Sequence, residues 1–393
     1  MGITVGQHRA LFFVYLLIHC TFPACAQAAD DYSLLQNLLM KKNADGVITL
    51  PAGNFQLKRS LTLTQDNVHL KGQGIGKTIL NFGGQVSGSE GIRVSGKNIV
   101  LSDFSLYETP GDGIKAIDSE NITFKHLEVG WKHGASNKQG TYAIYPVASK
   151  NILIEHCETF GATEAGIYVG QSTGSKVIHN YAYNNTVGIE AENSVDTVIA
   201  DNRIIDNSLG VLISDIPGLP MFGKNTHILR NEIRNNNRAN DIDNKAHLGY
   251  NQNGAGVVLV ATKSVLVDQN HFSAHLITDI AVLHYHSTNF RRSRVLYDPN
   301  VRDIQIGSNH HKAIAQPTSN VRHAFYKWVV PDASRTLLWD GRISQDKLYA
   351  PLSNWQHLCL KELLHDGRIV EGEGNTTKLK SLKDADLLCR NTI

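Results

Sequence analysis

Gly166-Ile167-Tyr168-Val169, Gly188-Ile189-Glu190-Ala191 and Gly210-Val211-Leu212-Ile213 are three copies of one short motif, each 22 residues after the last. The same spacing separates two earlier copies, which begin at Gly91 and Gly113. A repeat of about 20–45 residues is typical of solenoid proteins, in which each repeat buries its apolar side only by stacking on its neighbours. The motif therefore predicts a stack of similar coils.

A second pattern, aliphatic-x-x-Asn, repeats in the same register. It ends at Asn180, Asn202, Asn231 and Asn270, and Cys157 takes the Asn position in one further copy. Five residues after three of these asparagines comes another, at Asn185, Asn207 and Asn236. Asparagine tolerates left-handed backbone and forms local hydrogen bonds, so it suits a tight turn. On stacked coils, such asparagines are expected to form ladders.

Short β-branched runs with period-two alternation lie between these turns, and helical periodicity is missing there. Such runs indicate β-strands. We predict an all-β fold, a single-stranded parallel β-helix over residues 47–309, right-handed because parallel crossovers almost always are. Leucines at 34, 35, 38 and 39 predict an amphipathic cap helix within residues 29–46. Residues 310–393 lose the period and are predicted to form an irregular or α-rich C-terminal cap.

Residues 1–28 have the pattern of a secretory signal. Arg9 precedes a short apolar run, and small residues around 24–28 fit a cleavage site. The apolar run is too short to span a bilayer, and no other stretch is long enough. We therefore expect an exported protein, periplasmic or secreted, without a transmembrane segment.

The five cysteines are interpreted in that light. Cys20 and Cys25 fall in the predicted signal, and Cys157 is expected to be a free, buried residue. An exported chain permits disulfides, so we predict a bridge between Cys359 and Cys389.

Charge and motifs limit the possible partners. The chain has 38 basic and 36 acidic residues, which argues against a general nucleic-acid binder. No C-x-x-C motif occurs, so haem attachment and zinc-ribbon interpretations have no basis. We expect a monomer without a cofactor, with calcium as the one alternative.

Several stretches resemble known proteins. Residues 50–53 (LPAG) and 72–74 (GQG), followed by the repeated coils, resemble the right-handed β-helix superfamily of pectate lyases, alginate-type lyases and mannuronan C5-epimerases. Residues 142–147, 164–172 and 215–220 are similar to a family of exported bacterial parallel β-helix repeat proteins. That resemblance implies the fold and export but no activity. Members of this family occur beside exported c-type haem proteins, which implies a role in the cell envelope.

One departure from the superfamily matters. The C5-epimerases carry an Asp-Pro-His-Asp motif in a coil that resembles Tyr145-Pro146-Val147-Ala148, and only the proline is kept here. The catalytic residues of those enzymes therefore cannot be assigned to this position.

Two insertions break the period, at residues 130–140 and 237–254, each just before a Gly-Ile-x-Val strand. They are predicted to project from the same edge, four coils apart, which is about 19 Å at the usual strand spacing. Between them, the outward position of the strand is predicted to hold a row of residues, namely Lys115, Tyr145, Tyr168, Glu190 and Leu212. Loops on one edge of a rigid scaffold usually carry function.

The residue types of this row suit an acidic polysaccharide. Tyrosines offer flat faces to sugar rings, cations meet carboxylates, and a uronate lyase or epimerase needs a proton acceptor and a proton donor. The predicted catalytic residues are His133 or Tyr145 as base, Lys115, and Glu190 as acid or cation ligand. The predicted substrate-binding residues are Trp131, Lys132, Tyr168 and Glu164.

Other interpretations of the same residues stay open. Tyr145 and Tyr168 could be a stacked structural pair, and Lys115 and Glu190 a solvated face. His284 and His286 alternate along a strand and could bind a metal, whereas His310 and His311 are interpreted as a linker. For the whole protein, the alternatives to a lyase or epimerase are a purely structural surface protein and a non-catalytic envelope binding or scaffold protein. The latter would act with a partner such as an exported c-type haem protein.

Overall fold

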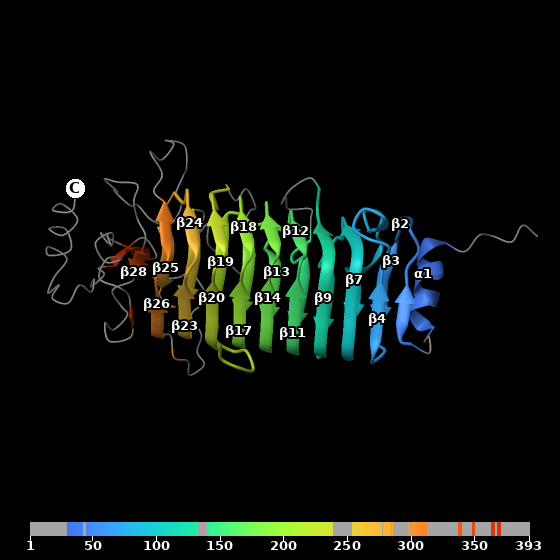
Figure 1. Cartoon of the computed structure of the whole chain (residues 1–393), viewed down its shortest axis with the longest axis horizontal. Coiled ribbons are helices and arrows are strands. Elements are labelled where there is room, and N and C mark those ends of the chain that lie inside the picture. The colour runs from blue at the N-terminus through green and yellow to red at the C-terminus, as the bar shows by residue number, and fades with distance from the viewer. Residues whose placement is uncertain are drawn as a thin grey trace, which may run out of the picture.

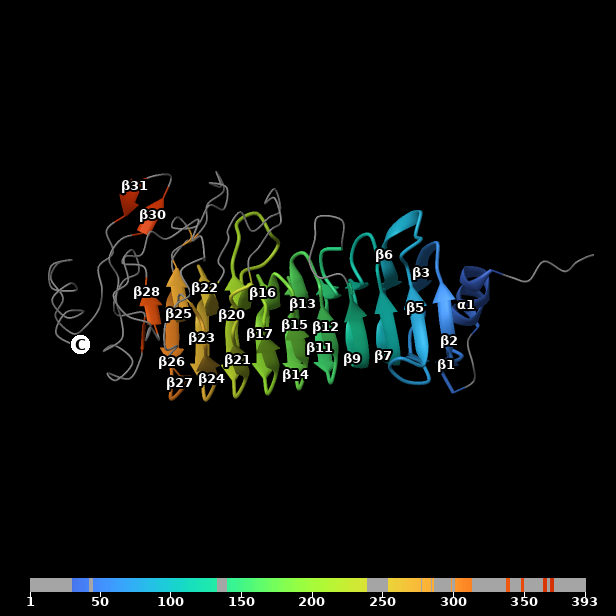
Figure 2. The same cartoon turned by 90° about the horizontal axis from the view of Figure 1, so that it is seen from above.

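The computed structural model describes residues 30–41, 45–132, 140–238, 254–276, 278–283, 285, 298 and 301–312, together with the backbone of four short strands beyond them. Parallel strands lie side by side along the length of the molecule, with one helix at the N-terminal end (Figures 1 and 2). Most coils contribute three strands, so the stack has three faces, which we name A, B and C. The predicted all-β parallel β-helix is confirmed.

Face A is a separate parallel sheet. Its strands are β3 (Arg59–Leu63), β6 (Ser87–Val94), β8 (Ile114–Ile117), β10 (Ile144–Val147), β13 (Ala165–Gly170), β16 (Val187–Glu192), β19 (Leu209–Ser214), β22 (Ala255–Val260), β25 (Thr278–Leu283) and β28 (Leu337–Trp339).

Faces B and C form one bent sheet, because β7 (Lys97–Tyr107) and β9 (Glu120–Gly130) run through both. The other strands of face B are β1 (Val47–Thr49), β4 (Val68–Lys71), β11 (Lys150–Glu155), β14 (Thr173–Ile178), β17 (Val195–Ala200), β20 (Lys224–Leu229), β23 (Lys263–Asp268), β26 (Arg302–Ile306) and β29 (Leu348–Tyr349). Those of face C are β2 (Gly53–Gln56), β5 (Thr78–Asn81), β12 (Glu158–Phe160), β15 (Tyr181–Tyr183), β18 (Arg203–Ile205), β21 (Glu232–Arg234), β24 (His271–Ser273) and β27 (His310–Lys312).

Helix α1 (Asp31–Met40) lies where the cap helix was predicted. The Asp30 side chain caps it by accepting a hydrogen bond from the backbone N–H of Ser33 at 2.8 Å. Leu35 and Leu39 are buried and join the core, so the helix covers the apolar end of the first coils. Within the described residues it is the only helix, and none there is long and apolar enough to cross a membrane.

The interior consists of columns of aliphatic side chains, one from each coil. On face A the paired residues Ile167, Ile189, Val211, Val257 and Ile280 are fully buried. Each gains burial only from the coils above and below, which explains why the apolar residues recur at the repeat spacing.

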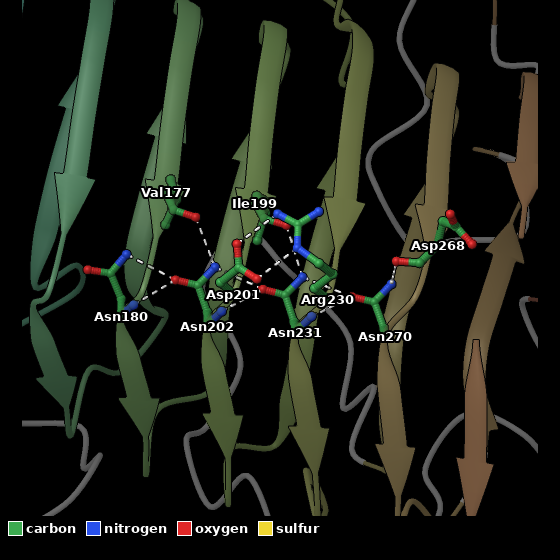
Figure 3. A network of polar contacts seen from close by, with 9 residues as sticks. All are labelled: Val177, Asn180, Ile199, Asp201, Asn202, Arg230, Asn231, Asp268 and Asn270. Atoms are coloured by element: carbon green, nitrogen blue, oxygen red, sulfur yellow. Dashed lines mark hydrogen bonds and ion pairs between the residues drawn. The ribbon is translucent and has the colours of Figure 1, made fainter. Parts of the chain in front are cut away.

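The predicted asparagine ladders are present at both turns that flank face C. Between faces B and C, Asn202 accepts hydrogen bonds from the N–H and Nδ2 of Asn180 at 2.8 and 3.0 Å. Its own Nδ2 donates to the carbonyl of Val177 and to Oδ1 of Asn231, both at 2.9 Å (Figure 3). Asn270 and Asn309 continue this ladder. Cys157 stands before it as a free, buried thiol whose pKa burial raises to about 12.

Parallel pairing extends further than the predicted boundary at residue 309. Strands β27, β28 and β29 pair with β24, β25 and β26. The interpretation of His310 and His311 as a linker is therefore wrong, because both lie in β27, where His311 pairs with Phe272. An antiparallel pair, β30 (Leu363–His365) and β31 (Arg368–Val370), follows. The predicted signal at 1–28 and the predicted Cys359–Cys389 bridge lie outside the described residues.

Candidate functional site

The outer surface of face A carries a graded row of side chains. The pairing register places Lys115 beside Tyr145, Tyr168 beside Glu190, and Glu190 beside Leu212. On the N-terminal side, Arg93 pairs with Lys115. From β6 to β19 the row therefore passes from cations through tyrosines to a carboxyl group and then to apolar residues.

Three tyrosines pack together in the middle of this row. The ring centroid of Tyr142 lies 4.7 Å from that of Tyr145 and 4.5 Å from that of Tyr168. The rings of Tyr145 and Tyr168 meet edge to face, with their centroids 4.9 Å apart. Tyr142 donates its hydroxyl to Glu164 at 2.7 Å, and Tyr168 donates to Glu192 at 2.6 Å. We call these six residues, Tyr142, Tyr145, Tyr168, Glu164, Glu190 and Glu192, the tyrosine–carboxyl cluster.

Glu190 is the unusual member of the cluster. Its side chain is buried, with 1% of the residue exposed, and its Oε2 accepts no hydrogen bond from any described residue. Burial raises the pKa of Glu190 well above its ordinary value, and the nearby Glu192 and Glu164 raise it further. Its surroundings therefore favour the neutral carboxylic acid, the form that can donate a proton.

The cluster is more enclosed than the sequence suggested. Tyr168 and Glu164 are buried as well, and Tyr145 is half-buried. The tyrosine rings pack on one another, and Ile216, in the segment after β19, packs against the same apolar group. The alternative of a solvated face is therefore wrong for Glu190. Tyr145 and Tyr168 do pack against each other, as the alternative interpretation expected. Contact between a ligand and the exposed part of Tyr145 stays a prediction.

Lys115 lies at the cationic end of the row, next to the tyrosine–carboxyl cluster. Its Nζ lies 4.5 Å from the centroid of the Tyr145 ring and 3.6 Å from a carboxylate oxygen of Asp112. Burial raises the pKa of Asp112 to about 6. A half-buried cation beside an aromatic face can hold an anionic sugar at this position.

Two of the predicted binding residues lie elsewhere. Trp131 is buried in the interior, and its Nε1 donates to the carbonyl of Thr109 at 2.7 Å, so the indole cannot stack on a sugar. Its predicted binding role is wrong, because the chain after β9 turns this side chain inward. Lys132 lies with its Nζ 4.2 Å above the ring of Tyr107, at the end of β7, and not against the tyrosine row. His133 lies outside the described residues.

The site residues predicted from the sequence include neither Tyr142 nor Glu192. Glu192 follows Glu190 by two positions on one strand, so period-two alternation already placed both on the same face. Tyr142 lies in the turn before β10, where alternation gives no guidance. Tyr285 is buried in the same outer apolar group, whereas His284 and His286 lie outside the described residues.

In the described part of the chain, no group of three or more His, Cys, Asp or Glu side chains is arranged to hold a metal ion.

Comparison with known proteins agrees with this architecture. The model of the family described as right handed beta helix region matches residues 90–295, more than half of the 393 residues. The chain belongs to this family. The handedness predicted from the repeats is thereby confirmed for this β-helix protein. No curated protein sequence matches it.

Three solved structures illustrate how far the likeness of this β-helix protein extends. The A-module of mannuronan C-5 epimerase AlgE4 from Azotobacter vinelandii is 16% identical, with 84% of this chain and 94% of that one covered and a TM-score of 0.50. PfbA, a surface adhesin of Streptococcus pneumoniae, is 14% identical, with 74% of this chain and 78% of that one covered and a TM-score of 0.52. DFA-IIIase from Arthrobacter chlorophenolicus A6 is 10% identical, with 84% of this chain and 93% of that one covered and a TM-score of 0.51. At these identities the likeness shows the fold alone.

Proposed function

We propose that this β-helix protein binds an acidic polysaccharide along the outer row of face A and processes it with Glu190 as the proton donor. The observation that carries the proposal is the buried carboxyl group of Glu190, which lies near two other carboxyl groups and whose Oε2 has no hydrogen-bond partner among the described residues. Buried titratable groups with strongly perturbed pKa values cluster at functional sites. A structural carboxyl group in this position would be expected to have a hydrogen-bond partner.

The N-terminal end of the row supplies the contacts that an acidic sugar needs. Arg93 and Lys115 pair with each other in register and are only partly covered, with side-chain exposures of 46% and 23%. Each lies near one carboxylate, Glu90 at 2.9 Å and Asp112 at 3.6 Å. Uronate carboxylates would bind at these two cations, and the adjoining sugar ring would pack on the exposed part of Tyr145.

Glu190 can serve either of the two predicted reactions. In β-elimination, a base takes the proton next to the uronate carboxyl group, the bond from the ring carbon to the leaving oxygen breaks, and Glu190 donates its proton to that oxygen. In C5-epimerisation, the base removes the same proton from one side of the ring, and Glu190 returns a proton to the other side. Glu190 becomes a carboxylate in each case and must be reprotonated before the next turnover.

Tyr145 is a poor candidate for the base. Burial and the nearby Asp112 raise the pKa of Tyr145 to about 12, which disfavours the tyrosinate form. Of the two bases predicted from the sequence, His133 or Tyr145, we therefore propose His133. We also propose that the protein is exported by the segment at residues 1–28 and acts in the periplasm or outside the cell.

Likeness of fold supports a carbohydrate ligand. Among the similar structures, the mannuronan C-5 epimerase and DFA-IIIase are named as enzymes, and PfbA is named as an adhesin. A second candidate function is non-catalytic binding in the envelope, with a partner such as an exported c-type haem protein. The hydrogen bonds of Tyr142 and Tyr168 favour this second function, because these hydroxyl groups already donate to carboxyl groups of the cluster itself, Glu164 and Glu192.

A panel of uronate polymers tests the proposal. Polymannuronate, polyguluronate and polygalacturonate are incubated with the protein, with absorbance near 235 nm reporting elimination and proton NMR of the polymer reporting epimerisation. Glu190→Gln keeps the shape of the side chain but removes its acidic proton. The rate of polymer conversion should therefore fall about 10²–10⁴-fold, with polymer binding retained. Glu232→Gln, on the partly exposed surface of face C, is the matched control and should keep full activity.

The outcome separates the two candidates. If the wild-type protein changes none of the polymers yet binds one on a glycan array, the catalytic proposal is wrong and the binding function stands. Full activity of Glu190→Gln would exclude Glu190 as the proton donor.

A further inference from the structure

A column of three exposed histidines lies on the turn between faces B and C, on a different part of each coil from the tyrosine–carboxyl cluster. His126, His156 and His179 occupy the same position on three consecutive coils, with left-handed φ values of 48°, 52° and 57°. Their ring centroids are 5.3 and 5.1 Å apart, and the rings of His156 and His179 are nearly parallel. The rigid parallel register thus presents three imidazoles in a line.

Aspartates occupy the same turn position on the coils before and after the histidines. Oδ1 of Asp103 lies 3.5 Å from Nδ1 of His126. At the other end Asp201 follows His179, and Arg230 on the next coil holds it through hydrogen bonds of 2.9 and 2.7 Å (Figure 3). The Asp103 carboxylate thus lies on the Nδ1 side of the His126 ring, and no described residue bonds its Nε2. Many metal-binding histidines have a carboxylate on the nitrogen that does not bind the ion.

The remaining ring nitrogens are not used by the fold. Within the described residues, His156 and His179 make ring contacts but no side-chain hydrogen bond or ion pair. Both residues are exposed. Neutral imidazole nitrogen is a preferred ligand of Zn²⁺, Cu²⁺ and Ni²⁺.

We propose that this histidine column binds a divalent transition-metal ion through ring nitrogens of neighbouring histidines. Two nitrogens on one tetrahedral ion, each about 2.0–2.1 Å from it, lie roughly 3.4 Å apart. The rings now stand about 5 Å apart by their centroids, and the exposed side chains reach that separation by turning toward each other. No three donors among the described residues already surround a common point, so the ion itself draws the rings together. His156 takes part whichever neighbour it joins.

Calorimetric titration of the untagged protein with Zn²⁺ or Ni²⁺ alone tests the proposal. His156→Asn removes the central ligand and keeps a residue that accepts left-handed backbone, so the fold should be preserved. We expect this variant to bind at least about 10-fold more weakly than wild type. His227→Asn, on the outer surface of β20, is the matched control and should titrate like wild type.

The position of the ion is tested separately, because the chain has 18 histidines. Substoichiometric Cu²⁺ should broaden the ring proton signals of His126, His156 and His179 before those of other histidines. Broadening confined to other histidines would overturn the proposal. So would equal affinities of wild type and His156→Asn, with circular dichroism confirming that both are folded.

Discussion

Tyr168 donates its hydroxyl to Glu192 at 2.6 Å, while Glu190, two residues earlier on the same face of β16, has no hydrogen-bond partner for its Oε2 among the described residues. Gln171 adds a second donor to Glu192 at 3.2 Å. Two identical side chains on one strand therefore have opposite environments. The carboxyl group of Glu192 accepts two hydrogen bonds, whereas burial favours the neutral acid at Glu190.

Glu190→Gln should stabilise the protein at alkaline pH. Because the folded state raises the pKa of Glu190, it binds this proton more tightly than the unfolded state does. The stability from this group is fully present below the ordinary Glu pKa of 4.5 and is lost as pH rises above it. Gln cannot ionise, so the free energy of unfolding of the variant rises relative to that of wild type by up to about 1.4 kcal/mol for each pH unit above 4.5, until the pKa of Glu190 in the folded state is reached. Urea unfolding at pH 5, 7 and 9 measures the difference, and a constant difference would contradict the assigned protonation.

Tyr168→Phe should destabilise the protein by about 0.5–1.5 kcal/mol, because it removes the hydrogen bond from a buried hydroxyl to the half-buried carboxyl group of Glu192 and keeps the ring packing. Urea unfolding at pH 7 measures the loss. Tyr142→Phe is a matched variant, since Tyr142 makes the corresponding bond to Glu164. A loss near zero in both would mean that water replaces these hydroxyls at no cost and that the cluster is open to solvent.

The fold was predictable because every coil repeats the same local requirements. An aliphatic residue in the inward position and an asparagine at the turn recur at the coil spacing, so each coil supports the interpretation of the next. The pairing of Lys115 with Tyr145 and of Tyr168 with Glu190 followed from the same register. What repeats in sequence also stacks in space.

The environment of the site was not predictable, because it depends on segments that break the period. Tyr142 and Ile216, which pack against the outer apolar group that contains Tyr168 and Leu212, come from turns outside the repeat. Trp131 follows β9 directly, where alternation no longer says which side of the chain faces inward. The column around His156 was missed for a different reason. Left-handed turn positions accept many polar residues, so histidine occupies this position on only three coils and is replaced by Asp103 and Asp201 on the coils before and after.

Asn202→Ala should cost about 3 kcal/mol or more. The change leaves the buried N–H of Asn180 and the carbonyl of Val177 without their partners, and each unpaired group costs about 1–3 kcal/mol. Asn54→Ala is the control, because the exposed Asn54 side chain accepts one hydrogen bond, from Gln56, and its loss should change stability by at most about 0.5 kcal/mol. Equal midpoints of urea unfolding for the two variants would show that the buried ladder adds nothing.

A buried carboxylate joins two histidines at the C-terminal end of the described coils. Asp279 accepts hydrogen bonds from Nδ1 of His275 at 2.7 Å and from Nδ1 of His311 at 2.8 Å. Burial alone would raise the pKa of Asp279, but these two hydrogen bonds outweigh it and hold the pKa below the ordinary value. The group therefore stabilises the fold above the ordinary Asp pKa of 3.8, and this contribution is lost as pH falls through the lowered folded pKa.

Asp279→Asn should lower stability at pH 7 by about 3 kcal/mol, because one partner of a buried charged network is removed. Amide hydrogen exchange should quicken first in β25 and β27, which carry Asp279 and His311. Asp303→Asn, at an exposed left-handed position of β26, is the matched control and should leave both measurements unchanged. The deficit of Asp279→Asn should shrink as pH falls below about 4, since wild type then loses the same interaction. A deficit that stays constant with pH would show that the carboxylate charge is not what holds these histidines.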